Sequence, residues 1–360
     1  MITELFPSNK SKQNEAPFVI AGPCSVETPE QLMTTVGQLK KEGISWIRGG
    51  VWKPRTRPGS FEGVGEIALP WIQAAKKEFG VKFAIEVASA NHVELALKHD
   101  MDMLWVGARS TANPFTVQEI AESLKGAKVP VLIKNPINAD LSLWQGAFER
   151  FQKAGITDLA AVHRGFSNLR EQVYRNSPMW QIPIDFKRTF PEIPMICDPS
   201  HIAGKRSLVQ IIAQKALDLS FDGFLIESHH QPDLAWSDAA QQLTPQALGE
   251  MLKNLKTRSI HFEGVQMRNQ LEEIRAQIDQ ADHELLEAIH RRMTLIEKIG
   301  EYKKLNNVAV LDLDRWKEIF ETRPVWGQEM GINEELIQEL FALIHQESVK
   351  KQTEILDKVD

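Results

Sequence analysis

The chain has 360 residues, of which 42% are hydrophobic and 25% charged, with a formal net charge of -6. Its length exceeds what one hydrophobic core usually organises, so we expect two domains, and its charge gives no general attraction to nucleic acid or acidic membranes. The polar N-terminus and the lack of any run of about 18 apolar residues predict a cytoplasmic protein with neither nucleic-acid nor membrane partners.

From residue 18 onward, short apolar runs rich in β-branched residues alternate with amphipathic helical patterns. The runs cover residues 18–25, 46–52, 82–88, 103–108, 129–136, 159–166, 194–201 and 223–230. Near-continuous apolar strands that alternate with helices indicate a parallel sheet covered on both faces. Eight such units in about 240 residues predict an α/β fold, a closed (β/α)8 TIM barrel. A doubly wound open sheet is the rival, because sequence indicates strand number better than closure.

The pattern changes after Lys256. Residues 266–305 contain no proline and carry apolar residues at helical spacing, which predicts one helix of about 60 Å. We expect a short second helix over 313–322, a loop over 324–331 and a third helix after Asn333, a favourable N-cap. Two short partners cannot bury the long helix, so we expect a homodimer through this all-α unit, with a tetramer as a further option.

The expected order is therefore a polar N-terminal segment, the barrel, a linker and an all-α three-helix domain. Their predicted bounds are 1–17, 18–256, 257–265 and 266–360. In a barrel of this type the active site lies at the C-terminal ends of the strands, so the polar residues there are the candidates for chemistry.

The predicted strand ends are rich in cations. The basic residues there are Arg48, Lys53, Arg55, Arg109, Lys134 and Arg164. One such residue is usually a snorkelling or salt-bridged side chain. Several at one rim repel one another unless an anion neutralises them, and Arg forks with a Lys point charge suit phosphate and carboxylate. We therefore predict a site for two anionic substrates.

A second group of rim residues has the chemistry of metal ligands. It consists of Cys24 after the first strand, His201 after the seventh, Glu227 at the end of the eighth and Asp238 in the loop beyond. Closure of the barrel makes strands seven, eight and one neighbours, so these side chains can meet. The set suits a borderline divalent ion, Mn²⁺ by preference, with Fe²⁺, Co²⁺ and Zn²⁺ as alternatives. Asp198 is placed to orient His201, whereas Cys197 is interpreted as core.

Several short motifs follow one another on these predicted strands: AGPCSVE, IRGGVWKPRTRP, VGAR, IKNP, HRG, CDPSH and IESH. Over residues 15–255 they resemble the short branch of type I 3-deoxy-D-arabino-heptulosonate 7-phosphate (DAHP) synthases, a branch shared with 3-deoxy-manno-octulosonate 8-phosphate synthases. The octulosonate enzymes typically carry a KANRS-like segment where this chain has KPRT, so the resemblance favours DAHP synthase. It implies metal-dependent condensation of phosphoenolpyruvate with erythrose 4-phosphate.

The resemblance also implies residue roles. It places Arg48, Lys53, Arg109, Lys134 and Arg164 on the phosphate and carboxylate of phosphoenolpyruvate, and Pro54, Arg55 and Thr56 at the sugar-phosphate end of the site. The metal polarises the aldehyde oxygen as a Lewis acid. Lys53 is also a candidate proton donor. Glu86, at the end of the third predicted strand, is the candidate for handling the attacking water, with a structural ion pair as its alternative.

Along the long helix of the tail, Arg292 and Lys303 are placed to bind one ligand between them. They are 11 residues apart, which is about 16 Å in rise and only about 20° in azimuth. Arg275 lies about 25 Å before Arg292 and about 100° around the helix, so it is better placed for a partner's site. For any one of these residues, a solvated helix surface is the alternative.

Two further polar pairs, Asp312 with Arg315 and Ser348 with Gln352, share a helix face by their spacing. With Arg275, Arg292 and Lys303, they make residues 267–356 resemble the all-α chorismate mutase fold, an intertwined dimer. The resemblance implies that these residues bind chorismate, that Arg292, Lys303 and Gln352 act in catalysis, and that Arg275 reaches the other protomer's site. Trp316 stands where many members have Glu, which leaves the contact to the substrate's ring hydroxyl open.

The mutase reaction converts chorismate to prephenate and needs cationic clamping of the substrate rather than a nucleophile. The fusion of a first-step enzyme to a domain that binds a downstream product of the same pathway favours the hypothesis that prephenate or chorismate inhibits the synthase. Three alternatives stay open: an octulosonate-type barrel, a tail that only binds and regulates, and a sugar-phosphate sensor in place of the barrel enzyme.

Overall fold

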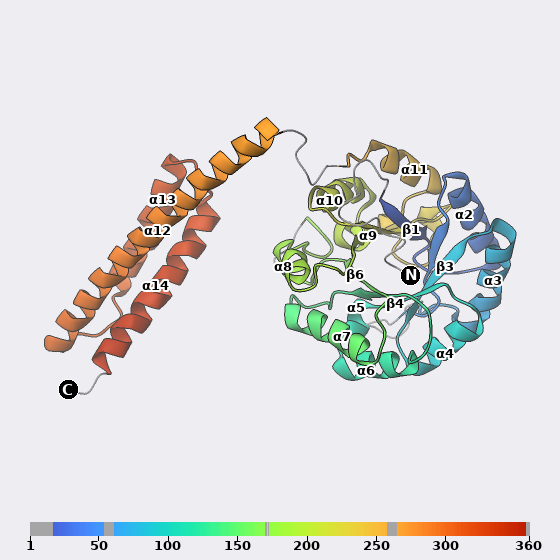
Figure 1. The fold of residues 1–360 in the computed structure, drawn as a ribbon, viewed down its shortest axis with the longest axis horizontal. Coiled ribbons are helices and arrows are strands. Elements are labelled where there is room, and N and C mark those ends of the chain that lie inside the picture. Colours follow the sequence, from blue (N-terminus) through green and yellow to red (C-terminus); the bar gives the residue numbers. More distant parts are fainter. Residues whose placement is uncertain (1–16, 54–60, 170, 172, 258–264, 358–360) are drawn as a thin grey trace. The chain divides into compact units, whose positions relative to one another are not determined.

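The computed structural model describes residues 17–53, 61–169, 171, 173–257 and 265–357. The chain divides into two compact units, Met1–His261 and Phe262–Asp360 (Figure 1). The predicted linker, residues 257–265, spans this division. No helix among the described residues is long and apolar enough to cross a membrane.

The described residues of the first unit form a closed barrel of parallel strands in the order β1 to β8, with β8 paired back to β1 (Figure 1). The strands are β1 Phe18–Gly22, β2 Trp46–Gly49, β3 Lys82–Val87, β4 Met103–Val106, β5 Val131–Lys134, β6 Leu159–His163, β7 Met195–Cys197 and β8 Gly223–Glu227. The predicted TIM barrel is confirmed, and the open-sheet alternative is wrong. Each strand ends before its predicted run does, because the residues that follow belong to rim loops or, after β4 and β7, to the short helices α5 Ala108–Thr111 and α9 Pro199–Ala203.

A ring of helices covers the outside of the barrel (Figure 1). They are α2 Pro29–Lys41, α3 Ala68–Phe79, α4 Ala90–Lys98, α5 Ala108–Thr111, α6 Pro114–Ser123, α7 Leu141–Lys153, α8 Gln181–Thr189, α9 Pro199–Ala203, α10 Arg206–Asp218 and α11 Pro245–Asn254, with 3₁₀ turns at Gly65–Ile67, Pro232–Leu234 and Ala239–Gln241. Several begin at a side-chain cap: Thr28, Ser89, Asn113, Asp140 and Thr244 each accept a backbone N–H of the first turn. Such caps satisfy donors that have no partner inside the helix, so the sequence fixes these helix starts locally.

Side chains alternate along each strand between two hydrophobic cores, because successive residues point to opposite faces of a sheet. The outer core packs the strands against the helices. The inner core fills the barrel itself with Ile20, Trp46, Ala84, Met103, Trp105, Leu132, Ala160, Val162, Ile196 and Leu225. The barrel is therefore solid below its rim, and the site lies on top of this inner core.

The described residues of the second unit form α12 Val265–Leu305, α13 Leu313–Glu329 and α14 Glu334–Leu356. The expected loop over 324–331 is wrong for most of its length, since α13 continues through Pro324 to Glu329. Close packing against α14 outweighs the hydrogen bond that proline removes. An added Cβ at Gly327 would lie 2.6 Å from Ile337 Cγ1, so the two helices approach more closely here than a residue with a side chain would allow.

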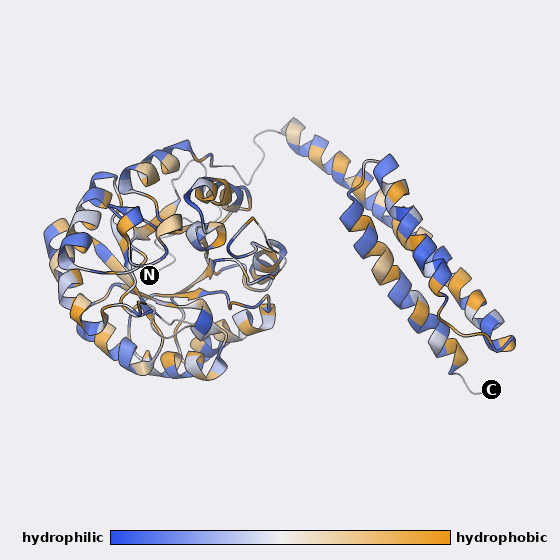
Figure 2. Cartoon of the chain, turned by 180° about the vertical axis from the view of Figure 1, so that it is seen from behind, coloured by the Kyte–Doolittle hydropathy of each residue, from blue (hydrophilic) through white to orange (hydrophobic). Residues whose placement is uncertain are grey.

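The N-terminal half of α12 leaves its apolar side chains exposed within one chain. They are Met267, Ile274, Ile278, Leu285 and Leu286, each more than half exposed. Figure 2 shows hydrophobic residues recurring along this helix. Contacts with α14 cover only its C-terminal part, where an added Cβ at Gly300 would lie 2.9 Å from Ile355 Cδ1.

Candidate active sites

The barrel's polar site follows from strand periodicity. Residues two positions beyond the inner core point in the same direction but lie above it, at the rim. Trp46 is followed in this way by Arg48, Ala84 by Glu86, Leu132 by Lys134, Val162 by Arg164, Ile196 by Asp198 and Leu225 by Glu227. The strand register therefore brings polar side chains from distant parts of the chain to one end of the barrel.

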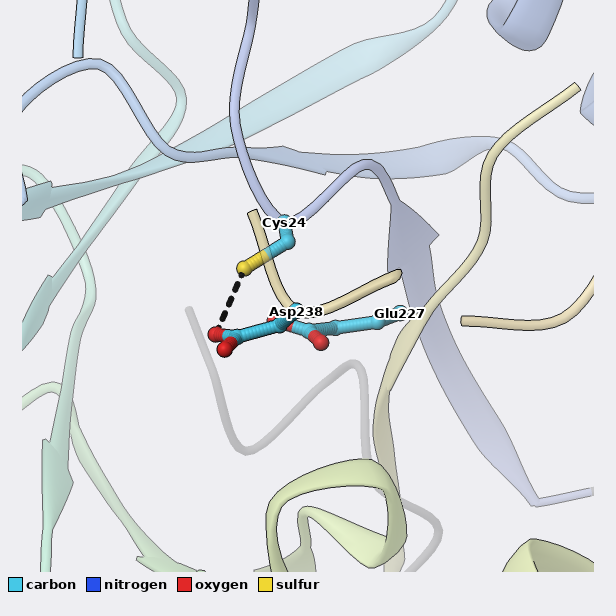
Figure 3. A group of neighbouring side chains, drawn as sticks. All are labelled: Cys24, Glu227 and Asp238. Carbon is cyan, nitrogen blue, oxygen red and sulfur yellow. Dashed lines mark hydrogen bonds between the residues drawn. The ribbon is translucent and has the colours of Figure 1, made fainter. Parts of the chain in front are cut away.

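Three of the predicted metal ligands gather at this rim. One ligand atom from each of Cys24, Glu227 and Asp238 lies within 4.8 Å of the others. Figure 3 shows the Cys24 sulfur pointing at the Asp238 carboxylate, with the Glu227 carboxylate beside it. The sulfur lies 3.1 Å from Asp238 Oδ2. The fourth predicted ligand, His201, lies at the edge of this group, with Nε2 3.7 Å from Glu227 Oε1.

Cys24 is fully buried and lies beside a lysine. Lys53 Nζ donates to its sulfur at 2.7 Å. Burial raises the pKa of the Cys24 thiol, and Glu227 adds to the rise, while Lys53 opposes it. A bound cation would reverse this balance, because a metal ion favours the thiolate.

Asp238 has an unusual backbone conformation, in the left-handed region with φ 49° and ψ 36°. Its Oδ1 accepts a hydrogen bond from Arg175 Nη1 at 2.9 Å, and the same nitrogen donates to Gln241 Oε1 at 2.7 Å. Burial by itself raises the pKa of Asp238, but Arg175 and His201 outweigh it, so the pKa lies below its usual range. The carboxylate is therefore held in its charged form.

Asp198 connects the metal group to the cationic side of the site. It is fully buried at the end of β7, where it accepts from Lys134 Nζ at 2.6 Å and contacts His201 Nδ1 at 3.0 Å. Its side chain also caps α9 by accepting the His201 backbone N–H. The His201 ring is thus fixed through Nδ1, and Nε2 turns toward Glu227.

Arg48 is the most deeply buried cation of the rim, at 2% exposure. Its Nη2 lies 3.3 Å from Glu227 Oε1, and its guanidinium lies over the Trp105 ring. Within the described part of the chain, Arg48 Nε and Nη1 have no hydrogen-bond partner, and neither has Glu227 Oε1. Buried polar atoms are normally satisfied, so the Arg48 nitrogens without a hydrogen bond point to an anionic ligand. Glu227 Oε1 accepts no hydrogen bond, although it faces Arg48 Nη2 and His201 Nε2, so it stays available to a bound cation.

Arg164 and Arg109 extend the cationic surface. Arg164 Nη1 donates to Asn176 Oδ1 at 2.7 Å, and its backbone N–H donates to Asn135 Oδ1. Burial lowers the pKa of Arg164 to about 10, Asp198 opposes this, and Arg175 and Arg109 lower it further. Arg109 lies exposed on the short helix α5 and belongs to the same electrostatic group.

Glu86 lies at the end of β3, beside β2. Its Oε2 accepts from Trp105 Nε1 at 3.0 Å, and an added Cβ at Gly107 would lie 2.0 Å from its Oε1. The side chain is therefore held in a slot that a larger residue at 107 would fill. The other predicted residues of this part of the site, Pro54, Arg55 and Thr56, lie outside the described residues.

The tail has its own polar cluster, built on the contact between α12 and α14. Arg292 Nη1 donates to Ser348 Oγ at 2.6 Å. One turn further, Gln352 is buried with its Nε2 bonded to the Ser348 carbonyl, while its Oε1 has no partner among the described residues. Burial lowers the pKa of Arg292, and Arg323 and Arg315 lower it further, so three guanidinium groups share this region.

The remaining predicted tail residues lie in the α12–α13 loop region or on the surface. Lys303 Nζ donates to the Val310 carbonyl at 2.6 Å. Asp312 caps α13 by accepting the Arg315 N–H, and the Arg315 side chain pairs with Glu318. Arg275 is exposed and pairs with Glu272 on the same helix.

At the position that departs from the mutase pattern, Trp316 stacks on His345. The ring centroids lie 3.6 Å apart at 24°. Burial lowers the pKa of His345 and Arg292 adds to the lowering, so this aromatic pair borders the arginine cluster.

Sequence reasoning missed Arg175, Gln241 and Arg323. Arg175 lies in the long loop between β6 and α8 rather than at a strand end, and Gln241 lies beyond β8. Arg323 follows no spacing rule relative to Arg292, because the two are on different helices. The length of the β6–α8 loop was the one available signal, since long loops over a barrel rim often carry function.

Comparisons with known proteins divide the chain at the same place. The sequence model of the DAHP synthetase I family matches residues 8–263, and that of chorismate mutase type II matches residues 274–353. The phospho-2-dehydro-3-deoxyheptonate aldolase of Thermotoga maritima is 30% identical over 238 residues, which are 66% of this chain and 68% of that protein. The 2-dehydro-3-deoxyphosphooctonate aldolase of Bartonella henselae is 26% identical, over 67% of this chain and 90% of its own length.

Solved structures give the same similarity for the barrel. The crystal structure of the Thermotoga maritima DAHP synthase aligns with a TM-score of 0.59 at 28% identity, covering 65% of this chain and 66% of that chain. A truncated form of the same enzyme aligns with a TM-score of 0.57 at 27% identity, covering 65% and 83%.

Proposed function

The chain belongs to the DAHP synthetase I family and carries a chorismate mutase type II domain, and on that premise we propose that its barrel condenses phosphoenolpyruvate with D-erythrose 4-phosphate. The products are DAHP and inorganic phosphate. The chain thus combines a transferase with an isomerase. The substrates are those that the family resemblance implies, and the residues proposed to handle them are argued from the geometry of the two clusters.

The unpaired nitrogens of Arg48 carry the proposal for the barrel. A buried guanidinium with free donors, next to Lys134 and Arg164, is suited to the phosphate and carboxylate of phosphoenolpyruvate. Lys53 and Arg109 complete this cationic surface. Binding here orients the enol carbon C3 toward the aldehyde of the second substrate; water then adds at C2 and phosphate leaves.

Cys24, His201, Glu227 and Asp238 fit a divalent ion, with Mn²⁺ preferred, because a sulfur and two carboxylates converge, the His201 imidazole lies at their edge, and Glu227 Oε1 accepts no hydrogen bond. Such an ion supplies Lewis acidity toward the aldehyde oxygen. Asp198 orients the imidazole of His201, and Lys53 is placed to donate a proton near this point. Glu86, fixed by Trp105, is the candidate that positions the attacking water.

Erythrose 4-phosphate rather than a five-carbon aldose phosphate is proposed from the KPRT segment at residues 53–56. Octulosonate aldolases also align with the barrel, so the five-carbon substrate is the second candidate. Assays of purified protein with phosphoenolpyruvate and either arabinose 5-phosphate or erythrose 4-phosphate, with and without EDTA, test the proposal. Faster turnover of arabinose 5-phosphate would refute the four-carbon assignment, and turnover insensitive to EDTA would refute the metal.

For the tail, we propose that Arg292, Lys303, Arg315 and Gln352 bind chorismate and promote its rearrangement to prephenate. The buried, unpaired Gln352 Oε1 beside the Arg292–Ser348 contact supports this placement. Asp312 caps α13 through Oδ1, and its second carboxylate oxygen, Oδ2, is the one proposed to face the ligand. The aromatic pair of Trp316 and His345 replaces the carboxylate that many members have at 316.

The exposed apolar side chains of α12 support a homodimer in which Arg275 reaches the partner's cluster. Pairing of dimers into tetramers is a further option. Prephenate or chorismate bound to the tail is proposed to inhibit the synthase, since a downstream product of the pathway would then restrain its first step. The cytoplasm is the proposed location.

A further inference from the structure

The loops that carry Cys24 and Asp238 are joined by a buried polar cluster outside the proposed ligand set. We call this cluster, formed by Ser25, Glu27, Ser237 and Gln242, the rim clamp. All four side chains are at most 6% exposed. Two of them follow β1 and two follow β8, so the rim clamp spans the seam where the barrel closes.

Glu27 is the centre of the rim clamp. Its Oε1 accepts hydrogen bonds from Ser25 Oγ at 3.1 Å and from the backbone N–H of Trp236 at 2.8 Å. Its Oε2 lies 3.6 Å from His229 Nε2. A carboxylate buried to this extent is costly unless it is bonded, and here its bonds reach the loop after β8.

Ser237 and Gln242 close the connection between the loops. Ser237 Oγ lies 2.6 Å from Ser25 Oγ, and the Ser237 carbonyl accepts from Gln242 Nε2 at 2.8 Å. Gln242 Oε1 in turn accepts the Cys24 backbone N–H at 3.0 Å. The Gln242 side chain therefore connects the backbone of Cys24 to Ser237, the residue before Asp238.

The rim clamp offsets a local backbone strain. Asp238 is a non-glycine residue with positive φ, an unfavourable conformation that persists where the surroundings fix it. Each of the three consecutive residues 236, 237 and 238 is anchored: Trp236 by Glu27, Ser237 by Ser25 and Gln242, and Asp238 by Arg175. Without these anchors, the loop would relax and Asp238 would turn away from Cys24.

We propose that Glu27 is a positioning residue for the metal centre, which through the rim clamp holds Asp238 and Cys24 at ligand distance from each other. Glu27 itself touches neither substrate nor metal. The proposal rests on the proposed metal site and adds to it the residue that preorganises the ligands. Removing a residue that orients metal ligands lowers metal affinity, because the ligands are then ordered only when the metal binds, which makes binding less favourable.

The test is Co²⁺ binding to the full chain after removal of metal with a chelator. A Cys24–Co²⁺ bond gives a thiolate-to-metal charge-transfer absorption, which reports the ligand set independently of activity. We expect Glu27→Ala to weaken Co²⁺ binding about 10- to 100-fold and to reduce this absorption at subsaturating metal. Glu27→Gln, whose amide oxygen still accepts both bonds of Oε1, should stay within about threefold of the wild type.

Asp222→Ala is the matched control. Asp222 is another buried carboxylate that accepts a backbone N–H, from Met195, but it lies at the opposite end of the barrel, before β8. The Asp222→Ala substitution should lower the melting temperature of the metal-free protein while leaving Co²⁺ affinity unchanged. Ser237→Ala, which removes only one hydroxyl of the rim clamp, should weaken binding about threefold or more and decides the question if Glu27→Ala does not fold.

Wild-type Co²⁺ affinity in Glu27→Ala and Ser237→Ala would overturn the inference and leave the metal site standing. An equal loss in Asp222→Ala would also overturn it, because the effect would then be one of general stability. A wild-type chain that gives no charge-transfer absorption with Co²⁺ would refute the metal site itself, and with it this inference.

Discussion

Lys53 Nζ and Cys24 Sγ lie 2.7 Å apart, which joins the cationic side of the barrel site to the metal side. Lys53 thus connects the two clusters, as Asp198 and Arg48 also do. Its charge opposes the rise in the pKa of the Cys24 thiol that burial causes. A substitution at either residue is therefore expected to affect both metal binding and substrate binding.

The two cysteines give a matched pair for testing the metal group. Cys24→Ala should lower kcat of DAHP formation at least 100-fold at saturating Mn²⁺, because it removes the sulfur of the ligand set. Cys197 is equally buried but packs in the outer core, so Cys197→Ala should keep kcat within about twofold. Steady-state assays of both variants over a range of Mn²⁺ concentrations make the comparison. Equal activity of the two would rule out Cys24 as a ligand.

Removing the Arg48 guanidinium should mainly impair phosphoenolpyruvate binding. A hydrogen bond to a charged group contributes about 1.5–3 kcal/mol, so Arg48→Met should raise KM for phosphoenolpyruvate about 10- to 150-fold. KM for erythrose 4-phosphate should change less. Initial rates with each substrate varied in turn provide the measurement. A variant whose KM rises only for the sugar phosphate would contradict the placement.

Substitutions at Arg292 and at its neighbour Arg291 distinguish the effect of the tail's binding cluster from the effect of surface charge. Arg292→Ala should lower chorismate mutase kcat/KM at least 100-fold, since it removes a cation that bonds Ser348 inside the cluster. Arg291 is exposed and pairs with Glu287, so Arg291→Ala should leave the rate unchanged. The rate of chorismate consumption decides the matter, and similar losses in both variants would contradict the assigned cluster.

Feedback inhibition is tested with the same pair of variants, without removing the tail. Prephenate, and chorismate in parallel, should inhibit DAHP formation by the wild type and by Arg291→Ala. Arg292→Ala should be resistant, because its tail no longer binds the inhibitor. Inhibitor titrations at fixed substrate concentrations supply the data. Synthase activity that stays constant in the wild type at saturating prephenate and chorismate would exclude this form of regulation.

His163 is predicted to make the barrel sensitive to acid. The ring is buried among Phe166, Trp180 and Phe221, and burial lowers its pKa from 6.5 to about 3. Below pH 6.5 the unfolded chain binds a proton that the folded chain does not, so stability present above pH 6.5 is lost as the pH falls. Between pH 7 and pH 5 this one group should cost about 2 kcal/mol.

His163→Phe should remove that part of the loss. Urea unfolding of the wild type and the variant at pH 7 and pH 5, followed by tryptophan fluorescence, gives the two differences in unfolding free energy. The variant's loss should be smaller by about 2 kcal/mol. Identical losses would show that the folded protein accommodates a charged His163.

Much of the barrel could be predicted because its signals are local. Apolar runs, N-caps such as Thr28 and Asn113, and the change of pattern near Lys256 each depend on a few neighbouring residues. Polar residues at strand ends could be listed for the same reason. The continuation of α13 through Pro324 could not, since it depends on the contact between Gly327 and Ile337 on another helix.

The sequence by itself determined the strand count, the helical tail and the kinds of side chain available for chemistry, because these follow from short-range periodicity and composition. Only the tertiary structure decided that Lys53 contacts Cys24, that Asp198 bonds both Lys134 and His201, and that Arg175 holds Asp238. Apart from Asp198 and His201, which are three positions apart, these contacts join residues 29 to 64 positions apart, and closure of the barrel between β8 and β1 places Cys24 beside Asp238. Their geometry is therefore a property of the whole fold and not of any single segment.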